Sequence, residues 1–213
     1  MSPPTALLSP LPMADGSAQY TDGPTTLLAS INGPIEVKPR DEIPLEAYLE
    51  ITIRPSAGVT SVREKHLEAL LRSAISPLIM RTVYPRTLLQ ITLQIIQHEQ
   101  ASAACTLHTL LASAIVVVVL ALVDAGVPMK GMLAAAFVEE ADGSAAHVFG
   151  YTVTGGGRDP SEGLVFVESD GAFDEKGFVE ASEIGRKRCL EVGELMKNWV
   201  REKVGKDMRY RLK

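Results

Sequence analysis

The sequence predicts an α+β fold in which mixed sheets pack on a buried central helix, with a long helix toward the C-terminus. The fourteen residues from Leu110 to Val123 contain no charged side chain, and a helix that is apolar on all sides is buried. Leu45–Arg54 and Leu89–Ile95 alternate between apolar and polar residues, which is typical of strands with one solvated face. The expected elements come as a run of strands, a helix, one strand, the central helix, three strands and a last helix, which lacks the regular alternation of a parallel α/β fold.

The central apolar run is best explained as one helix within Ala101–Pro128. Its four consecutive valines favour a strand by propensity, but strands are usually about 3–10 residues long and this run is longer. Gly126 and Pro128 directly after it are residues that commonly end a helix. A membrane span needs about 20 apolar residues, and no Lys or Arg stands between Thr87 and Met129 to anchor one. We therefore interpret the run as a core helix.

Before the central helix we expect several strands and one helix. Asn32-Gly33-Pro34 is a turn signal, so the segments on either side of it are expected to form a hairpin. Ser61 and Glu64 have the spacing of a capping box, which starts a helix that Pro77 disturbs at its end. The expected strands are Ala18–Tyr20, Thr26–Ile31, Ile35–Pro39, Leu45–Arg54 and Leu89–Ile95, the last of them antiparallel in type.

After the central helix the pattern returns to strands and then to a long helix. Asp142-Gly143 is expected to join two strands, and Asp170-Gly171 to end a third, short one. The expected strands are Met132–Val138, Ala146–Thr154 and Leu164–Val167, and the helix runs from Asp174 to about Lys203.

The chain is expected to form one domain with two tails. Residues 1–12 are rich in Pro and Ser and are predicted to be a flexible N-terminal tail. Residues 13–204 form the domain, and residues 205–213 a basic C-terminal tail. Met1–Pro12 contains four prolines and no basic residue, so we expect no secretory signal peptide.

Charge, cysteine and histidine content narrow the classes of function. The net charge of −5 makes the chain a poor nucleic-acid binder on its own, because phosphate contacts dominate that affinity. The charge is uneven: residues 124–183 hold twelve acidic and three basic residues, whereas residues 184–213 hold four acidic and ten basic ones. Cys105 and Cys189 are expected to be buried thiols of an intracellular protein. The four histidines have no ligand spacing, so we expect no metal and no cofactor.

Basic residues and one aromatic residue stand between the first helix and the strand that follows it. Arg81, Tyr84 and Arg86 occur there, and Lys38 and Arg40 follow the expected hairpin. If the sheet brings these loops together, they form a basic rim suited to a single-stranded phosphate backbone. The spacing alone is equally compatible with a scattered basic surface.

Four motifs, in this order, resemble the RNase PH domain family. They are Ala14–Ser17, Gly33–Glu36, Tyr84–Thr87 and Leu120–Met129. The resemblance runs from about Met13 to Val204 and implies a ribosomal protein S5 domain 2-like α+β fold, six such domains in a ring, and RNA threading through the ring. Gly33–Arg40 and the short N-terminus are most similar to one type of ring subunit of the eukaryotic RNA exosome.

The family's catalytic residues are not found at the positions of this chain that match them. Phosphorolytic members hold inorganic phosphate in a Gly-Thr/Ser-Arg loop just before the central helix. The corresponding positions here, near His108–Leu111 or Glu99–Ala101, contain neither glycine nor arginine, and Ala146–Thr154 lacks the acidic residues of active members. Phosphorolysis needs an anion site and a proton donor, so we expect a non-catalytic scaffold. A phosphorolytic or divergent exoribonuclease and a homo-oligomeric nucleic-acid binder stay as alternatives.

The resemblance also implies RNA contacts, partners and a location. Arg86 matches the family's RNA-contacting arginine, Lys38 and Arg40 match basic ring residues more loosely, and Arg81 belongs to the same rim. The implied partners are other RNase PH-like subunits in a six-membered ring, cap subunits with S1 and KH folds, RNA, and hydrolytic exoribonucleases associated through the complex. The implied location is the nucleus, including the nucleolus, and the cytoplasm, without membrane association.

Overall fold

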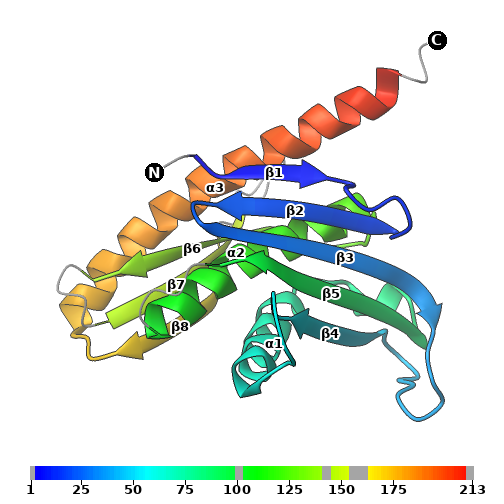
Figure 1. Cartoon of the computed structure of the whole chain (residues 1–213), viewed down its shortest axis with the longest axis horizontal. Helices are drawn as coiled ribbons and strands as arrows, with labels where there is room; N and C mark the ends of the chain where they lie inside the picture. Colours follow the sequence, from blue (N-terminus) through cyan, green and yellow to red (C-terminus); the bar gives the residue numbers. More distant parts are fainter. Residues whose placement is uncertain (1–2, 99–102, 141–144, 154–162, 210–213) are drawn as a thin grey trace.

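The central helix lies between two sheets in a computed structural model of the chain (Figure 1). The structure describes residues 3–98, 103–140, 145–153 and 163–209. Helix α2 (Ala103–Asp124) contacts strands of both sheets, and α3 (Glu175–Arg209) packs on the smaller sheet and extends past β1. The predicted α+β class, with a buried central helix and a long C-terminal helix, is confirmed.

The larger sheet has five strands in the order β1-β2-β3-β5-β4. They are β1 (Thr5–Leu8), β2 (Gly16–Asp22), β3 (Thr25–Glu36), β4 (Tyr48–Arg54) and β5 (Thr87–Gln97). All neighbours pair antiparallel except β4 and β5, which are parallel. The prediction that β5 is antiparallel therefore holds only toward β3, because α1 returns the chain from β4 to the same edge of the sheet.

The predicted hairpin at Asn32-Gly33-Pro34 is wrong, because β3 runs through this segment without reversing. The pairing of β3 with β5 shifts between Asn32 and Ile35, and such a β-bulge accommodates a proline that has no N–H to donate. Gly33 has φ +143°, and its N–H donates to Asp15 Oδ2 at 2.8 Å. The chain reverses one connection earlier, between β2 and β3.

The predicted tails are also wrong over part of their length. β1 pairs antiparallel with β2, and the Leu11 N–H donates to Ser17 Oγ at 3.0 Å, so the N-terminal segment is part of the sheet. The Pro and Ser content did not predict this strand, because the strand is stabilised by pairing with β2, which the fold places beside it. At the other end α3 continues to Arg209, so the first residues of the predicted basic tail are helical.

Helix α1 (Val62–Ile75) begins and ends where local signals placed it. The Ser61 N–H donates to Glu64 Oε2 at 2.6 Å, and the Arg63 N–H donates to Ser61 Oγ at 3.2 Å, so the capping box is confirmed. The helix ends two residues before Pro77.

Helix α2 forms the centre of the core, as predicted. Every residue from Leu110 to Leu122 is buried. Gly126 has φ +68°, the left-handed conformation of a glycine that ends a helix. Within the described part of the chain, Leu107–Asp124 is the one helical window long and apolar enough to cross a membrane, but 78% of it is buried inside the fold. The interpretation as a core helix is therefore confirmed.

The smaller sheet has the order β6-β7-β8 and packs between α2 and α3. Its strands are β6 (Met132–Glu139), β7 (Ala145–Val153) and β8 (Leu164–Gly171). β8 is longer than predicted, because Asp170 and Gly171 still pair with β7. The predicted turn Asp142-Gly143 lies outside the described residues.

Asp124, at the end of α2, joins three parts of the fold that are distant in sequence. Its side chain is only 4% exposed. It accepts hydrogen bonds from the Ser17 N–H at 2.9 Å, from Ser9 Oγ at 2.8 Å and from Lys203 Nζ of α3. A carboxylate is unfavourable at the negative end of a helix dipole, and the ammonium group of Lys203 offsets that cost.

Candidate nucleic-acid interface

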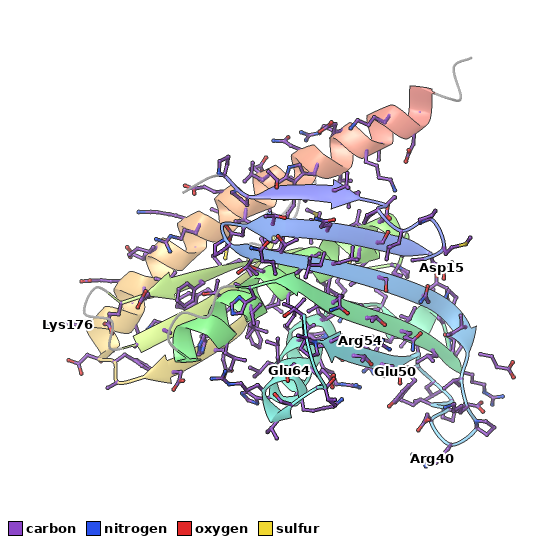
Figure 2. The ribbon with its side chains drawn as sticks, viewed as in Figure 1. Asp15, Arg40, Glu50, Arg54, Glu64 and Lys176 are labelled. Carbon is purple, nitrogen blue, oxygen red and sulfur yellow. The ribbon has the colours of Figure 1, made fainter. Side chains whose placement is uncertain are left out.

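Three strand ends meet at one edge of the five-stranded sheet. β3 ends where β5 begins, because the two strands are antiparallel, and β4 begins there too, because it is parallel to β5. The loop 37–47 and the segment 80–86 therefore lie side by side. Figure 2 shows Arg40 on loop 37–47, at the opposite end of the molecule from Lys176. The structure thus brings together the two loops that carry all four predicted RNA-binding residues, and we call this surface the rim.

Arg86 stands directly before β5 in a left-handed conformation, with φ 59°, which non-glycine residues rarely adopt. Its N–H donates to the Ile43 carbonyl oxygen at 3.3 Å, so its backbone is tied to loop 37–47. Its Nε lies 3.4 Å from Glu42 Oε1, and its side chain is 69% exposed. The guanidinium group is therefore accessible to an anionic ligand.

Arg81, at the start of the 3-10 turn η1 (Arg81–Val83), is held more firmly. Its carbonyl oxygen accepts from the Ala47 N–H at 3.0 Å, and its guanidinium lies 2.7 Å from Glu46 Oε2. The side chain is 29% exposed. Arg81 thus joins segment 80–86 to loop 37–47, and a phosphate would have to share it with Glu46.

Lys38 and Arg40 occupy an exposed turn of loop 37–47, in which the Asp41 N–H donates to the Lys38 carbonyl oxygen at 2.9 Å. The Arg40 guanidinium lies 3.9 Å from Asp41 Oδ1, and its side chain is 95% exposed. Lys38 makes no ion pair with any residue that the structure describes. Both cations can therefore reach a ligand in solution.

The rim carries mixed charge, which the sequence prediction of a basic rim did not anticipate. Asp41, Glu42 and Glu46 stand in the same loop, and each lies beside an arginine. The signal was present in the sequence, since these acids occur among the basic residues of one short loop. Exposed ion pairs contribute only about 0–1 kcal/mol, so Arg40 and Arg86 can exchange their carboxylates for phosphates at little cost.

Tyr84 does not offer the stacking surface that an aromatic residue could add to the rim. It is partly buried and packs against the hydrophobic core. Its carbonyl oxygen accepts from Thr87 Oγ1 at 2.8 Å, which positions the start of β5. Stacking of bases needs an accessible ring face, so any binding at the rim depends on charge.

The start of α2 is the second candidate site, because the family resemblance places the phosphate-binding loop of active members there. Glu99–Ala101 lies outside the described residues. In the other alternative, His108, Leu110 and Leu111 are buried in the core. The adjacent strand β7 contains no acidic residue. The side chains of His108, Leu110 and Leu111 therefore belong to the core packing of α2.

A buried histidine, His147, stands on β7 instead. Its Nδ1 lies 2.8 Å from Ser169 Oγ, and its Nε2 has no hydrogen-bond partner within the described residues. Three phenylalanine rings surround it: Phe149, Phe173 and Phe178. Burial lowers the pKa of His147, while the charge of Glu140 opposes and that of His108 reinforces this effect. A neutral histidine in this setting packs the sheet against α3. The described residues include no group of three His, Cys, Asp or Glu that could hold a metal ion.

Fold and sequence together define the class of protein. The family model "3′ exoribonuclease family, domain 1" matches residues 5–128, more than half of the chain. The chain therefore belongs to the RNase PH family of 3′ exoribonucleases, and its fold is the RNase PH fold. The predicted family is confirmed.

Individual relatives narrow the similarity further. The exosome complex component RRP46 of Saccharomyces cerevisiae is 34% identical over 194 residues, which are 84% of this chain and 86% of the relative. The exosome complex component rrp46 of Schizosaccharomyces pombe is 35% identical over 56% of this chain and 50% of its own. The exosome complex component Rrp41 of Archaeoglobus fulgidus is 27% identical over 94% and 83%. The expected similarity to one type of ring subunit of the eukaryotic RNA exosome is confirmed, and that type is RRP46.

The crystal structure of rice (Oryza sativa) Rrp46 has a similar fold. The TM-score is 0.79, and the match covers 92% of both chains at 24% sequence identity. At this identity the likeness supports the fold alone.

Proposed function

We propose that this chain is a non-catalytic structural subunit of the RNA exosome core ring. It supports 3′-to-5′ processing and degradation of RNA and lines part of the RNA channel. The observation that carries the proposal is the 34% identity to an exosome component of S. cerevisiae over 84% of this chain.

The lack of catalysis is supported by the surroundings of α2. Phosphorolysis requires donors arranged around an inorganic phosphate and a group that protonates the leaving oxygen. His108–Leu111 supplies neither a glycine nor an arginine, and its buried members face the core. The neighbouring histidine His147 is enclosed by aromatic rings, so it is unsuited to proton transfer with a substrate.

RNA contact is assigned to the rim. Arg86 and Arg40 have exposed guanidinium groups in weak ion pairs, and Lys38 is exposed without an ion pair to any described residue. Arg81 would act mainly by holding the two loops together through Glu46. Charge contacts of this kind bind a phosphate backbone without reading its sequence.

The proposed assembly is the one that the family resemblance implies, and the names of the relatives support membership of an exosome. The chain would pair with other RNase PH-like subunits in a six-membered ring, carry cap subunits with S1 and KH folds, and meet hydrolytic exoribonucleases through the complex. It would be present in the nucleus, including the nucleolus, and in the cytoplasm. Its net charge of −5 makes stand-alone RNA binding weak, so the ring would supply the remaining contacts.

A phosphorolytic 3′ exoribonuclease is the second candidate function. Two relatives, from Oryza sativa and Arabidopsis thaliana, have the word exonuclease in their names, at 30% and 33% identity over 60% and 56% of this chain. Glu139, Glu140 and Asp142 would be the acidic residues available to such an activity.

Incubation of the purified chain with single-stranded RNA and inorganic phosphate distinguishes the two functions. The scaffold proposal predicts that the chain alone releases no nucleoside diphosphates. It predicts the same for an assembled ring in which the other RNase PH-like subunits are inactive. Release that disappears when Glu139, Glu140 and Asp142 are replaced by their amides would establish the exoribonuclease instead.

A further inference from the structure

A depression of about 610 Å³ lies beside the rim, between the end of α1 and the segment that follows it. Its backbone frame is fixed by hydrogen bonds. The Met80 N–H donates to the Pro128 carbonyl oxygen at 3.0 Å, and the Lys130 N–H donates to the Leu78 carbonyl oxygen at 2.9 Å. Because these bonds hold segment 78–80 to segment 128–130, this part of the depression is a formed feature of the fold.

Positive charge predominates in this depression. Arg72, Arg81 and Lys130 line it together with one carboxylate, that of Glu46. Glu46 is paired with Arg81, while Arg72 donates from its guanidinium to the Leu49 carbonyl oxygen at 2.7 Å, a contact that neutralises no charge. Lys130 is exposed and pairs with no carboxylate among the described residues.

Within the part of the chain that the structure describes, the charges of Arg72 and Lys130 are therefore left without a carboxylate partner. The C-terminal end of α1 lies here and carries the equivalent of about half a negative charge. The helix dipole thus offsets only part of the excess. An anionic group bound in the depression would complete the charge balance.

Part of the lining of the depression is aliphatic. Pro77, Ile79 and Met80 contribute to it, and Met80 is 41% exposed. Ser73 and Ser76 also line it, and the Ser73 hydroxyl donates to the Ala69 carbonyl oxygen at 3.1 Å. A fitting ligand therefore combines an anionic group with an apolar group a few ångströms away.

Peptide chemistry fits this combination better than RNA chemistry. Sites for single-stranded nucleic acid pair positive charge with aromatic side chains on which bases stack, and none of the described residues that line the depression is aromatic. The aliphatic part of the lining instead accepts an aliphatic side chain. We infer that the depression docks an extended segment of a partner protein in which an Asp or Glu lies next to a Leu, Ile or Val.

Selection of displayed random heptapeptides against the full chain tests this inference. Counter-selection uses Lys130→Glu, which reverses one charge of the depression without touching the rim. Lys176→Glu is the matched control, since Lys176 is exposed at the other end of the molecule (Figure 2). The expected consensus contains a carboxylate beside an aliphatic residue. A synthetic peptide of that consensus should bind Lys130→Glu about tenfold more weakly than the wild type. It should bind Lys130→Arg and Lys176→Glu about as well as the wild type. A peptide in which Gln or Asn replaces the acidic residue should not bind.

Three results would overturn the inference. The first is a consensus without acidic residues, and the second is equal binding of the selected peptide to the wild type and to Lys130→Glu. The third is displacement of the peptide by a uridine oligonucleotide that itself shifts the amide resonances of residues 72–82. The test does not depend on ring assembly or on Arg86, so its failure would leave the proposed function standing. Thermal melting of each variant verifies that the charge reversals leave the fold intact.

Discussion

Two arginines of the rim, Arg81 and Arg86, differ mainly in how firmly their guanidinium groups are already held. Arg81 lies 2.7 Å from Glu46 and is 29% exposed, whereas Arg86 lies 3.4 Å from Glu42 and is 69% exposed. Side-chain exposure weakens an ion pair through solvent screening. We therefore expect Arg86 to contact RNA and Arg81 to maintain the shape of the rim.

Replacement of Arg86 by Glu should weaken RNA protection by the assembled ring about five- to tenfold, because a phosphate contact is replaced by repulsion. Ring assembly should not change. Arg54→Glu is the control, since Arg54 is exposed at the end of β4 away from loop 37–47. Nuclease-protection footprints of the two rings would be compared, and equal footprints would contradict the role of Arg86.

Asp124 permits a second test at the scale of one side chain. Asp124→Ala removes the shared acceptor of Ser9, Ser17 and Lys203, and should lower the free energy of unfolding by about 2–3 kcal/mol. Asp207→Ala removes the exposed carboxylate that lies 3.9 Å from the same Lys203, and should change it by no more than about 0.5 kcal/mol. Urea denaturation measures both. Similar losses in the two variants would show that burial of Asp124 is unimportant.

The sequence could suggest which cations form the rim, but not their partners. Arg86 and Lys38 stand in recognisable motifs, so they were predicted. Glu42 and Glu46 became relevant only once the parallel pairing of β4 and β5 placed their loop against segment 80–86. The distance between opposite charges is a tertiary property, and a count of charges along the chain does not contain it.

At the scale of elements, close packing between α3 and β7 depends on a helical glycine. A Cβ at Gly185 would overlap the ring of Phe149, whereas a Cβ at Gly205, on the same helix, would meet nothing within 4 Å. Gly185→Ala should therefore destabilise the protein by about 1–3 kcal/mol through overpacking. Gly205→Ala should stabilise it by about 0.5–1 kcal/mol through helix propensity. Thermal unfolding that shifts in the same direction for both variants would contradict this packing.

The same sheet should make stability dependent on pH. Burial lowers the pKa of His147 in the folded state, so between that lowered pKa and the ordinary value of about 6.5 the unfolded chain binds a proton that the folded chain does not. Stability should fall as pH decreases below about 6.5, by up to about 1.4 kcal/mol per pH unit for one such group. Burial also lowers the pKa of His98, which acts in the same direction.

The variant His147→Asn isolates the first contribution, because asparagine retains a polar group near Ser169 but does not titrate. Its free energy of unfolding, measured by urea denaturation from pH 7.5 to 5, should decline less steeply than that of the wild type. Parallel curves for the two proteins would mean that His147 has no part in the dependence.

Elements with local signals were predictable, and elements that depend on distant partners were not. The capping box of α1 and the terminal glycine of α2 lie next to the residues they affect, so both helices were predicted with nearly the observed ends. β1 is stable because β2 lies beside it, and β3 continues through Gly33 and Pro34 because β5 tolerates a bulge there. Secondary-structure propensities and turn signals depend on neighbouring residues in the sequence, so they predict neither of these two strand pairings.

At the scale of the whole molecule, α2 is packed between the two sheets, and His108, Leu110 and Leu111 are buried in the core. Exposed positive charge lies at the rim, in the depression beside it and along α3. A chain with a net charge of −5 and only local cations depends on neighbours for strong RNA binding. Function as one member of a ring is consistent with that distribution.

Native mass spectrometry of the tagged chain, purified under non-denaturing conditions from cells that express it at normal levels, tests the ring proposal most directly. We expect one copy of this 22.9 kDa chain in a particle that contains several different subunits, including further RNase PH-like chains. Particles whose masses are multiples of 22.9 kDa, without other subunits, would contradict a role in a mixed ring and would favour a homo-oligomeric RNA-binding protein.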